Sequence, residues 1–318
     1  MLTDNLKNAI ALRIVTQKKV VVEIFLMQQN PEQTFVVDLL TTLRQSRFSL
    51  RGWFIFFQRS WLMSYQTANA NPSLKQSWQR VTWLIALLAL IMLIGNGLFA
   101  GLANTLHMLP GFLFCIAWQQ YDLFWHLGLN RSVQNGKLLP NIGVANTLTW
   151  LRGLGASYLL GKLIGGLAIP SRLALAIFLC GIATDILDGH IARSTKTQSK
   201  LGQIADGETD FCLYLSLTVI LIQNGALPLW VGTIMLLRFL LPLAAALVSY
   251  LVFAYPIRFG STQWGKFAGL AQCLYFLVLL VPAPLTTFTH LLNVPLLSIT
   301  ICLLVAAPVA QFIANVRS

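Results

Sequence analysis

The sequence predicts an all-α, polytopic membrane protein, and this fold class follows from its composition and from its long apolar stretches. Hydrophobic residues make up 56% of the 318 residues and charged residues only 10%, whereas soluble globular chains carry about 25% charged residues. A soluble fold of this size could not cover its surface with so few charges. Soluble globular, disordered, coiled-coil, collagen-like and disulfide-rich chains are therefore excluded, and helices that span a bilayer remain.

Residues 1–80 are predicted to form a basic region in the cytoplasm or at the membrane interface. They hold ten Lys and Arg against four acidic residues and contain no spanning segment. A short helix is expected around residues 38–44. In residues 47–65, aromatic and apolar side chains at helical spacing alternate with arginines, which is typical of an interfacial amphipathic helix. Part of a soluble-domain core is an equally good interpretation of this second segment.

Eight apolar stretches follow, and each is predicted to be a transmembrane helix. With their flanks they reach roughly the 17–25 residues that a bilayer requires. The first two lie in residues 81–130 and the other six in residues 131–318. The predicted spans are residues 83–103, 109–127, 146–167, 172–190, 211–222, 227–254, 267–281 and 294–314.

The positions of Lys and Arg predict the orientation of these spans. Basic residues occur in residues 1–80, in the loops after the second, fourth and sixth spans, and at the C-terminus. With eight spans, all of these segments lie on one side, which should be the cytoplasm. Lys162 and Arg172 fall on the far side, where they could snorkel to the interface. The net charge of +12 is thus a signal for topology and for anionic lipid, and we expect no nucleic-acid partner.

Histidine and cysteine offer no obvious metal site. The five cysteines lie in apolar stretches without CxxC or Cys/His spacing, so neither a zinc site nor a disulfide framework is predicted. His107, His126, His190 and His290 show no ligand grouping. Asp122, in the second span, is a lone acid of the kind that is often tolerated near an interface.

Acidic residues instead gather in one short segment. Five of the ten fall between residues 185 and 210. Asp185 and Asp188 are three positions apart at the end of the fourth span, and Asp206 and Asp210 are four apart at the start of the fifth. Helical spacing puts each pair on one face, and the short loop brings the two pairs together. Four converging carboxylates would repel one another, so we expect two divalent cations, Mg²⁺ or Mn²⁺, held by oxygen ligands alone.

The spacing of this segment resembles the signature of the CDP-alcohol phosphotransferase family, D-x2-D-G-x2-A-R-x8-G-x3-D-x3-D. All eight fixed positions and every spacing agree. Small residues at two of these positions would let a large ligand approach closely, and the arginine could pair with a phosphate or a carboxylate. A glycine before the fifth span would let the loop turn. The matching residues are Asp185, Asp188, Gly189, Ala192, Arg193, Gly202, Asp206 and Asp210.

The resemblance extends to both sides of the motif. PNIGVANTLTWLRG is similar to the start of the family's first core helix, with Asn146, Thr149 and Arg152 in the matching places. It implies a core of six transmembrane helices from about residue 131, preceded by an amphipathic helix at residues 129–141. Arg238 resembles an arginine that members place in the acceptor pocket. WGKFAGLAQ is similar to a G-K-x-K-T-x-x-Q pattern of phosphatidylglycerophosphate synthases, with matches at Gly265, Lys266 and Gln272 but with Ala268 and Gly269 where Lys and Thr are usual.

This family resemblance implies an enzyme of phospholipid biosynthesis. A phosphatidyl-type group would pass from a CDP-linked lipid to an alcohol acceptor, with release of CMP at the cytoplasmic face. Asp185, Asp188 and Asp206 would hold the two metal ions; Asp210 would share a metal and take the proton of the attacking hydroxyl. Asp188, Gly189, Ala192, Arg193 and Gly202 would contact the nucleotide, and Arg238 and Lys266 the acceptor. Many members are dimers, so a homodimer is expected.

Two other classes of function remain open at this stage. A cation transporter or channel could use the acidic cluster as an ion path. A catalytically silent scaffold is also conceivable, although all four aspartates of the motif are intact. The departure at Ala268 and Gly269 puts glycerol 3-phosphate as acceptor in doubt, and no chemistry is predicted for residues 1–130.

Overall fold

The computed structural model describes residues 31–248, 263–281 and 286–317, and within them it contains helices and turns but no strand. The predicted all-α class is therefore confirmed. The chain divides into two compact units, residues 1–63 and 64–318. In the first unit, α2 (Pro31–Gln45) and the beginning of α3 (Leu50–Ala70) are separated by a turn in which Arg47 and Phe48 have positive φ. Arg59 and Asp38 form an ion pair of 2.9 Å between these two helices.

Helix α3 contains the predicted amphipathic segment. Leu50 is 91% exposed and Phe54 68% exposed, and Phe57 and Trp61 are also exposed, whereas Trp53 and Phe56 are half-buried. An interfacial amphipathic helix remains the prediction for this segment, since exposed large apolar side chains are of the kind that bind a lipid surface.

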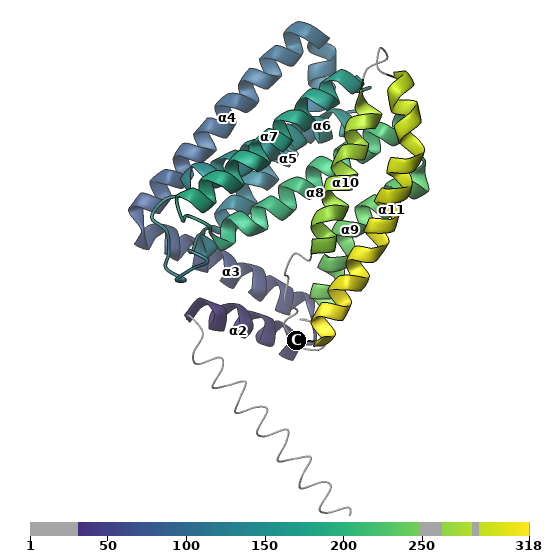
Figure 1. Cartoon of the computed structure of the whole chain (residues 1–318). Helices are drawn as coiled ribbons and strands as arrows, with labels where there is room; N and C mark the ends of the chain where they lie inside the picture. Colours follow the sequence, from purple (N-terminus) through teal and green to yellow (C-terminus); the bar gives the residue numbers. More distant parts are fainter. Residues whose placement is uncertain (1–30, 249–262, 282–285, 318) are drawn as a thin grey trace, which may run out of the picture. The chain divides into compact units, whose positions relative to one another are not determined.

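In the second unit, each of the eight predicted spans corresponds to one helix (Figure 1). Gly101, at φ +89°, separates the first two helices, and Gly166 and Gly225, also at positive φ, follow α6 and α8. Ser199 caps the N-terminus of α8 by accepting a hydrogen bond from the Gly202 N–H. The helices are α4 (Pro72–Ala100), α5 (Leu102–Trp125), α6 (Gly143–Ile164), α7 (Ser171–Ser194), α8 (Lys200–Gln223), α9 (Leu229–Val248), α10 (Gln263–Leu280) and α11 (Thr286–Arg317).

Among the described residues, three helices are long and apolar enough to cross a membrane by length and composition alone. These are α4, α7 and the Leu292–Ala310 part of α11. The eight-span topology remains a prediction for the other helices, and residues 249–254 of the predicted sixth span lie outside the described residues.

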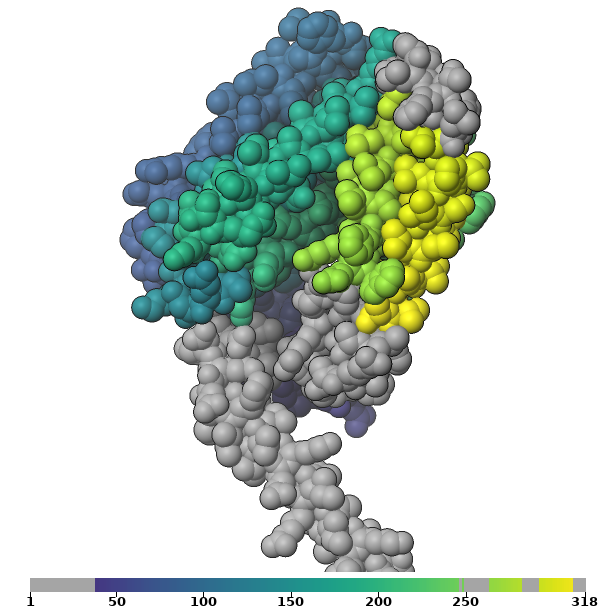
Figure 2. Space-filling view, in the orientation of Figure 1, coloured from purple at the N-terminus to yellow at the C-terminus, as the bar shows by residue number. Residues whose placement is uncertain are grey.

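The helices of the second unit share two hydrophobic cores. One joins α6, α7 and α8 to α9, α10 and α11 around Phe178, Tyr275 and Phe276. The other joins α4 and α5 to α6 and the start of α8, around Phe112 and Trp150. Figure 2 shows the surface hollowed between α7 and α10, with α8 lying deeper between them. The two additional helices α4 and α5 therefore pack on the same helices that carry the acidic motif.

The predicted amphipathic helix at residues 129–141 is wrong. A short 3-10 helix, η1 (Leu127–Leu129), ends there, and the chain then turns back on itself with Arg131 opposite Leu138. The reason is local: Asn135 and Gly136 are turn residues, and Gly136 has φ +69°. Residues 131–133 pair instead with the segment before α8, through Val133 N–H to Gln198 C=O at 2.9 Å and Lys200 N–H to Arg131 C=O at 3.0 Å.

Candidate active site

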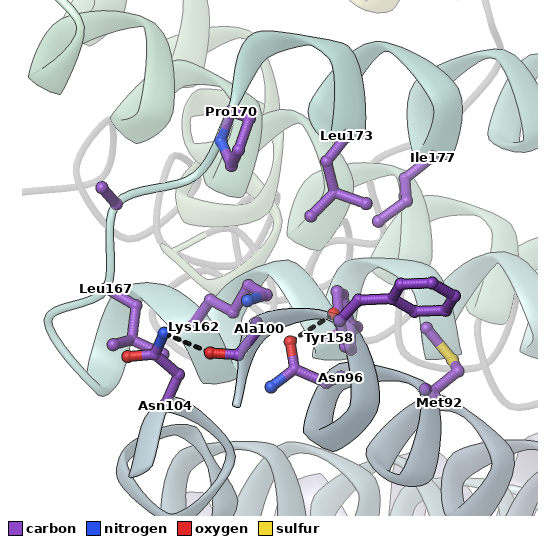
Figure 3. A pocket seen from close by; sticks show the side chains of 13 residues that line it. Met92, Asn96, Ala100, Asn104, Tyr158, Lys162, Leu167, Pro170, Leu173 and Ile177 are labelled. Atoms are coloured by element: carbon purple, nitrogen blue, oxygen red, sulfur yellow. Dashed lines mark hydrogen bonds between the residues drawn. The ribbon is translucent and has the colours of Figure 1, made fainter. Parts of the chain in front are cut away.

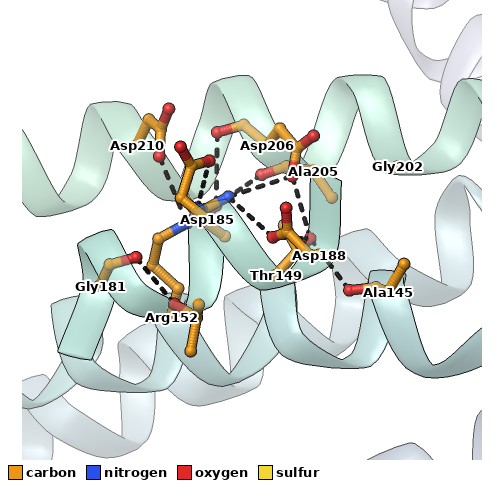
Figure 4. A network of polar contacts seen from close by, with 12 residues as sticks. Ala145, Thr149, Arg152, Gly181, Asp185, Asp188, Gly202, Ala205, Asp206 and Asp210 are labelled. Carbon is orange, nitrogen blue, oxygen red and sulfur yellow. Dashed lines mark hydrogen bonds and ion pairs between the residues drawn. The ribbon is translucent and has the colours of Figure 1, made fainter. Parts of the chain in front are cut away.

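The four aspartates of the motif converge as their spacing predicted. Asp185 and Asp188 lie in the last turns of α7, and Asp206 and Asp210 lie in the first turns of α8. Figure 4 shows their side chains turned toward one another above α6. We call this group the four-aspartate cluster.

A single buried arginine from α6 occupies the centre of the four-aspartate cluster. Nη1 of Arg152 lies 2.6 Å from Asp185, Nη2 lies 3.0 Å from Asp206 and 3.5 Å from Asp188, and Nε lies 3.3 Å from Asp210. The Arg152 side chain is only 1% exposed. Its planar guanidinium thus reaches all four acids at once, which a single ammonium group could not do with the same geometry.

Two further residues of α6 hold the cluster in place. The Thr149 hydroxyl lies 3.0 Å from Asp188 Oδ2 and 2.9 Å from Asp206 Oδ1, so it connects α7 to α8. The Asn146 amide donates to the Ser199 hydroxyl at 3.0 Å and to the Ile142 carbonyl at 2.8 Å. Asn146 therefore fixes the start of α6 to the start of α8 and lies beside the cluster rather than in it.

The four aspartates differ in exposure. The Asp188 side chain is 6% exposed, whereas those of Asp185, Asp206 and Asp210 are 57%, 45% and 35% exposed. A ligand can therefore reach three of the carboxylates from outside, while Asp188 forms the inner wall.

The donor set of this cluster fits divalent cations. Four carboxylates face one guanidinium, so three negative charges are unbalanced when all groups are ionised. Oxygen ligands without His or Cys favour a hard ion such as Mg²⁺ or Mn²⁺. The sequence places Arg152 only in the start of the first core helix, whereas the structure puts its positive charge at the centre of the acids. An arginine at the centre is also unfavourable for a cation path, which weakens the transporter interpretation.

The small residues of the motif lie close by but serve different purposes. At Gly189, an added Cβ would lie 3.0 Å from Nη1 of Arg193, so the exposed Arg193 folds over Gly189. The prediction that Gly202 lets the loop turn before α8 is wrong. Gly202 lies in the first turn of α8, buried against the Asn146 amide, where an added Cβ would clash. Ala192 is half-buried near the end of α7.

The two predicted acceptor residues lie on α9 and α10. Nη1 of Arg238 donates to Gln272 Oε1 at 3.2 Å, and its guanidinium lies 5.1 Å from the Phe239 ring centroid. The Phe239 ring lies 5.9 Å from that of Phe211, so the residues that precede them, Arg238 and Asp210, lie on neighbouring turns of α9 and α8. A Cβ on Gly269 would lie 2.5 Å from Nη2 of Arg238, so the unusual glycine makes room for this arginine. Lys266 is exposed in the first turn of α10.

A cavity of about 690 Å³ lies apart from the four-aspartate cluster, between α4, α6 and α7 (Figure 3). Lys162 lines it and was expected to snorkel to the surface. Instead Lys162 is 5% exposed, with its Nζ 5.5 Å from the Tyr158 ring centroid. The Tyr158 hydroxyl donates to Asn96 at 2.8 Å in the same cavity. Arg172 is exposed.

The structure brings together one group of possible metal ligands that the sequence did not predict. Asp122 and His126 of the α5 region lie together with Glu208 of α8, with one ligand-type atom of each within 4.8 Å of the others. Asp122 is therefore not a lone acid, and His126 is part of a group of ligand-type side chains. The only sequence signal was the i, i+4 spacing of Asp122 and His126, because Glu208 is remote in the chain.

Comparison with protein families gives one match, to a family model described as CDP-alcohol phosphatidyltransferase, over residues 142–307. This region contains Arg152, Thr149, the complete acidic motif and both predicted acceptor residues. Comparison with curated proteins and with solved structures gives no match. The apolar helices and the family together indicate an integral membrane protein. Because the match covers more than half of its 318 residues, the chain belongs to the CDP-alcohol phosphatidyltransferase family.

Proposed function

We propose that this protein transfers a phosphatidyl-type group from a CDP-linked lipid to an alcohol acceptor and releases CMP. The observation that carries the proposal is the four-aspartate cluster, assembled from two helix ends and partly open to ligands, within a chain of this transferase family. A multi-pass protein with this site at the cytoplasmic face, acting as a homodimer, fits the proposal.

Asp185, Asp188, Asp206 and Asp210 would hold the divalent ions. When bound, such ions would offset the charge of the pyrophosphate and of the departing CMP. The partial exposure of three of the four carboxylates supports this assignment, since the substrate phosphates must reach the same place.

The chain's own groups would orient the reactants. Asp210 is proposed as the base that takes the proton of the acceptor hydroxyl, because the next residue, Phe211, packs on Phe239 of α9, the neighbour of Arg238. Arg238 would receive a polar acceptor group. On the α7 side, Gly189 and Ala192 would leave space for the nucleotide once the exposed Arg193 turns away from Gly189 to pair with a phosphate. Arg152 and Thr149 act as positioning residues, because they hold the aspartates and are themselves buried.

The test is CMP release by the purified full-length protein. CDP-diacylglycerol and Mg²⁺ or Mn²⁺ are supplied with a panel of acceptors that includes glycerol 3-phosphate, inositol phosphate, serine and a lipid hydroxyl. We expect CMP release with at least one acceptor and its loss in excess chelator. Undiminished release in chelator would contradict the metal assignment. Nucleotide-independent flux of cations through proteoliposomes, without CMP release, would support the transporter alternative instead.

A further inference from the structure

Three ligand-type side chains meet on the side of α8 that faces away from the four-aspartate cluster. Asp122 and His126 come from the end of α5 and Glu208 comes from α8. We call them the α5–α8 triad. Nδ1 of His126 lies 3.0 Å from Oδ1 of Asp122, and one ligand atom of each residue lies within 4.8 Å of the other two.

Two buried polar atoms of the triad have no hydrogen-bond partner among the described residues. The Asp122 side chain is only 9% exposed. Among the described residues, neither its Oδ2 nor Nδ1 of His126 has a hydrogen-bond partner, although Nδ1 is close to Oδ1. Buried polar atoms are rarely left unpaired. Two carboxylates and an imidazole that face one another need a shared proton or a cation between them.

The triad is separate from the four-aspartate cluster. Glu208 follows Asp206 by two positions and precedes Asp210 by two, and a helix turns about 200° over two residues. Its side chain is therefore on the opposite side of α8. Gly153 of α6 lies against both helices, since a Cβ there would lie 2.5 Å from Gln119 Nε2 of α5 and 2.9 Å from Thr209 Cγ2 of α8.

The backbone around the triad is held by hydrogen bonds. The segment that follows α5 pairs with the segment that precedes α8, through Lys200 N–H to Arg131 C=O at 3.0 Å and Val133 N–H to Gln198 C=O at 2.9 Å. The segment that follows His126 is thus tied to the first residue of α8, eight positions before Glu208, independently of any ligand. Such preorganisation is what a metal site needs from its scaffold.

We propose that Asp122, His126 and Glu208 form a binding site for a divalent transition metal, Zn²⁺ in the first instance. One imidazole and two carboxylates suit zinc, whereas a site without nitrogen suits Mg²⁺. Zinc bonds of about 2.0–2.2 Å require ligand atoms roughly 3–4 Å apart, so only small side-chain movements would close the triad. Glu208 is exposed, which gives the ion a path of entry.

This site would connect the additional helices to the helix that carries Asp206 and Asp210. A metal bound there joins α5 to α8 by coordination bonds from both. It gives the second of the two N-terminal spans a chemical role that the family motif does not include, and it does not depend on the proposed transferase reaction.

The test measures zinc directly in the purified full-length protein. The protein is equilibrated with low micromolar Zn²⁺ in millimolar Mg²⁺, so that Mg²⁺ competes at the four-aspartate cluster, and bound zinc is measured by mass spectrometry. Cobalt(II) replaces zinc in a second sample, where nitrogen coordination alters the visible absorption. We expect about one zinc per chain. His126→Gln, Asp122→Asn and Glu208→Gln should each weaken binding by roughly tenfold or more, because even outer-shell changes cost tenfold to a hundredfold.

Three controls make the outcome decisive. His107→Gln changes an exposed histidine of the same helix and should leave zinc binding intact. Asp185→Asn, in the four-aspartate cluster, should also retain the zinc. His126→Cys supplies another zinc ligand and should bind zinc where His126→Gln does not, which distinguishes coordination from a general loss of folding. Zinc binding that is absent from the wild type, or unchanged in His126→Gln and Asp122→Asn, would overturn the proposal and leave a triad that shares a proton.

Discussion

At the residue scale, Arg152 holds the four carboxylates of the acidic site together from within the protein. It contacts four carboxylates with a side chain that is 1% exposed. A buried charge of this kind is retained only where opposite charges surround it. Arg152 thus holds these carboxylates from inside the protein, and the proposed divalent cations would bind the same carboxylates from the open side.

Because Arg152 and divalent cations would neutralise the same carboxylates, the stability of a variant that lacks Arg152 should depend on the cation concentration. Replacing Arg152 by Met should destabilise the fold, but by less than the roughly 3–5 kcal/mol typical of breaking a fully buried pair, since solvent screens three of the carboxylates. The loss should be smaller in millimolar Mg²⁺ or Mn²⁺ than in chelator, because cations then replace the missing charge. Thermal unfolding in detergent measures both conditions. Arg193→Met, at an exposed arginine that makes no ion pair with the cluster among those described, should show no such difference.

The aspartates themselves should separate into two kinds of mutant. At Asp206, Asn removes a full carboxylate and should weaken metal binding, so raising Mg²⁺ or Mn²⁺ restores part of the CMP release. At Asp210, Asn should leave CDP-lipid binding nearly unchanged and slow the chemical step, where a general base contributes typically 10²–10⁴-fold. A metal titration of CMP release beside a CDP-lipid binding assay checks both variants. Equal metal rescue of both variants would mean that Asp210 acts mainly as a ligand.

At the element scale, small residues allow the helices to approach closely. A Cβ on Gly161 of α6 would lie 2.8 Å from the backbone Cα of Phe112 in α5, and one on Gly165 would lie 2.7 Å from the carbonyl oxygen of His107. Contacts with backbone atoms cannot relax by rotating a side chain. Close packing through small residues is how helices associate in lipid, where the hydrophobic effect between them is absent.

This packing predicts the effect of one added methyl group. Gly161→Ala should lower the free energy of unfolding by about 1–3 kcal/mol, as overpacking of a close contact does. Gly95→Ala is the matched control, because a Cβ at that position in α4 meets nothing within 4 Å. It should leave stability unchanged or raise it slightly through helix propensity. Both variants are compared by thermal unfolding. Equal stability of the two would show that α5 and α6 can move apart to admit a methyl group without a loss of stability.

The elements also show how far sequence reasoning reaches. Apolar length predicted each helix of the second unit, and helical spacing predicted that Asp206 and Asp210 face the same way. No helix forms at residues 129–141, because Asn135 and Gly136 favour a turn there, which the family resemblance does not predict. The position of Arg152 and the partner of His126 could not be predicted. Both depend on contacts between helices far apart in the chain, for which a single sequence carries no signal.

At the scale of the whole molecule, the additional helices and the motif helices share a core. Val81, Ile85 and Phe112 from α4 and α5 pack in the same cluster as Trp150 of α6 and Leu201 of α8. Residues 64–318 form one compact unit, so the predicted division at residue 130 marks the extent of the resemblance and not a boundary in packing.

This shared core predicts how a truncated protein that starts at residue 129 should behave. It keeps every residue of the acidic motif, and we expect CMP release from whatever fraction folds. It should be clearly less stable than the full chain, because the faces of Trp150 and Leu154 that α4 and α5 cover would be exposed. Unfolding midpoints and CMP release per folded molecule are the measurements. A stable truncated protein that binds CDP-lipid but transfers nothing would instead assign a catalytic role to residues 1–128.

The pairing of residues 131–133 with residues 198–200 has a consequence for synthesis of the chain. Val133 and Gln198 are hydrogen-bonded partners although 65 positions separate them. The ribosome releases the first partner long before the second, and closing so long a loop costs chain entropy that only later contacts recover. Both α6 and α7 must therefore be synthesised before this pairing can form. Synthesis of this later partner also brings α8, which carries Asp206 and Asp210. The site is therefore complete only after the loop has closed, and a nascent chain that stalls before α8 has no complete site.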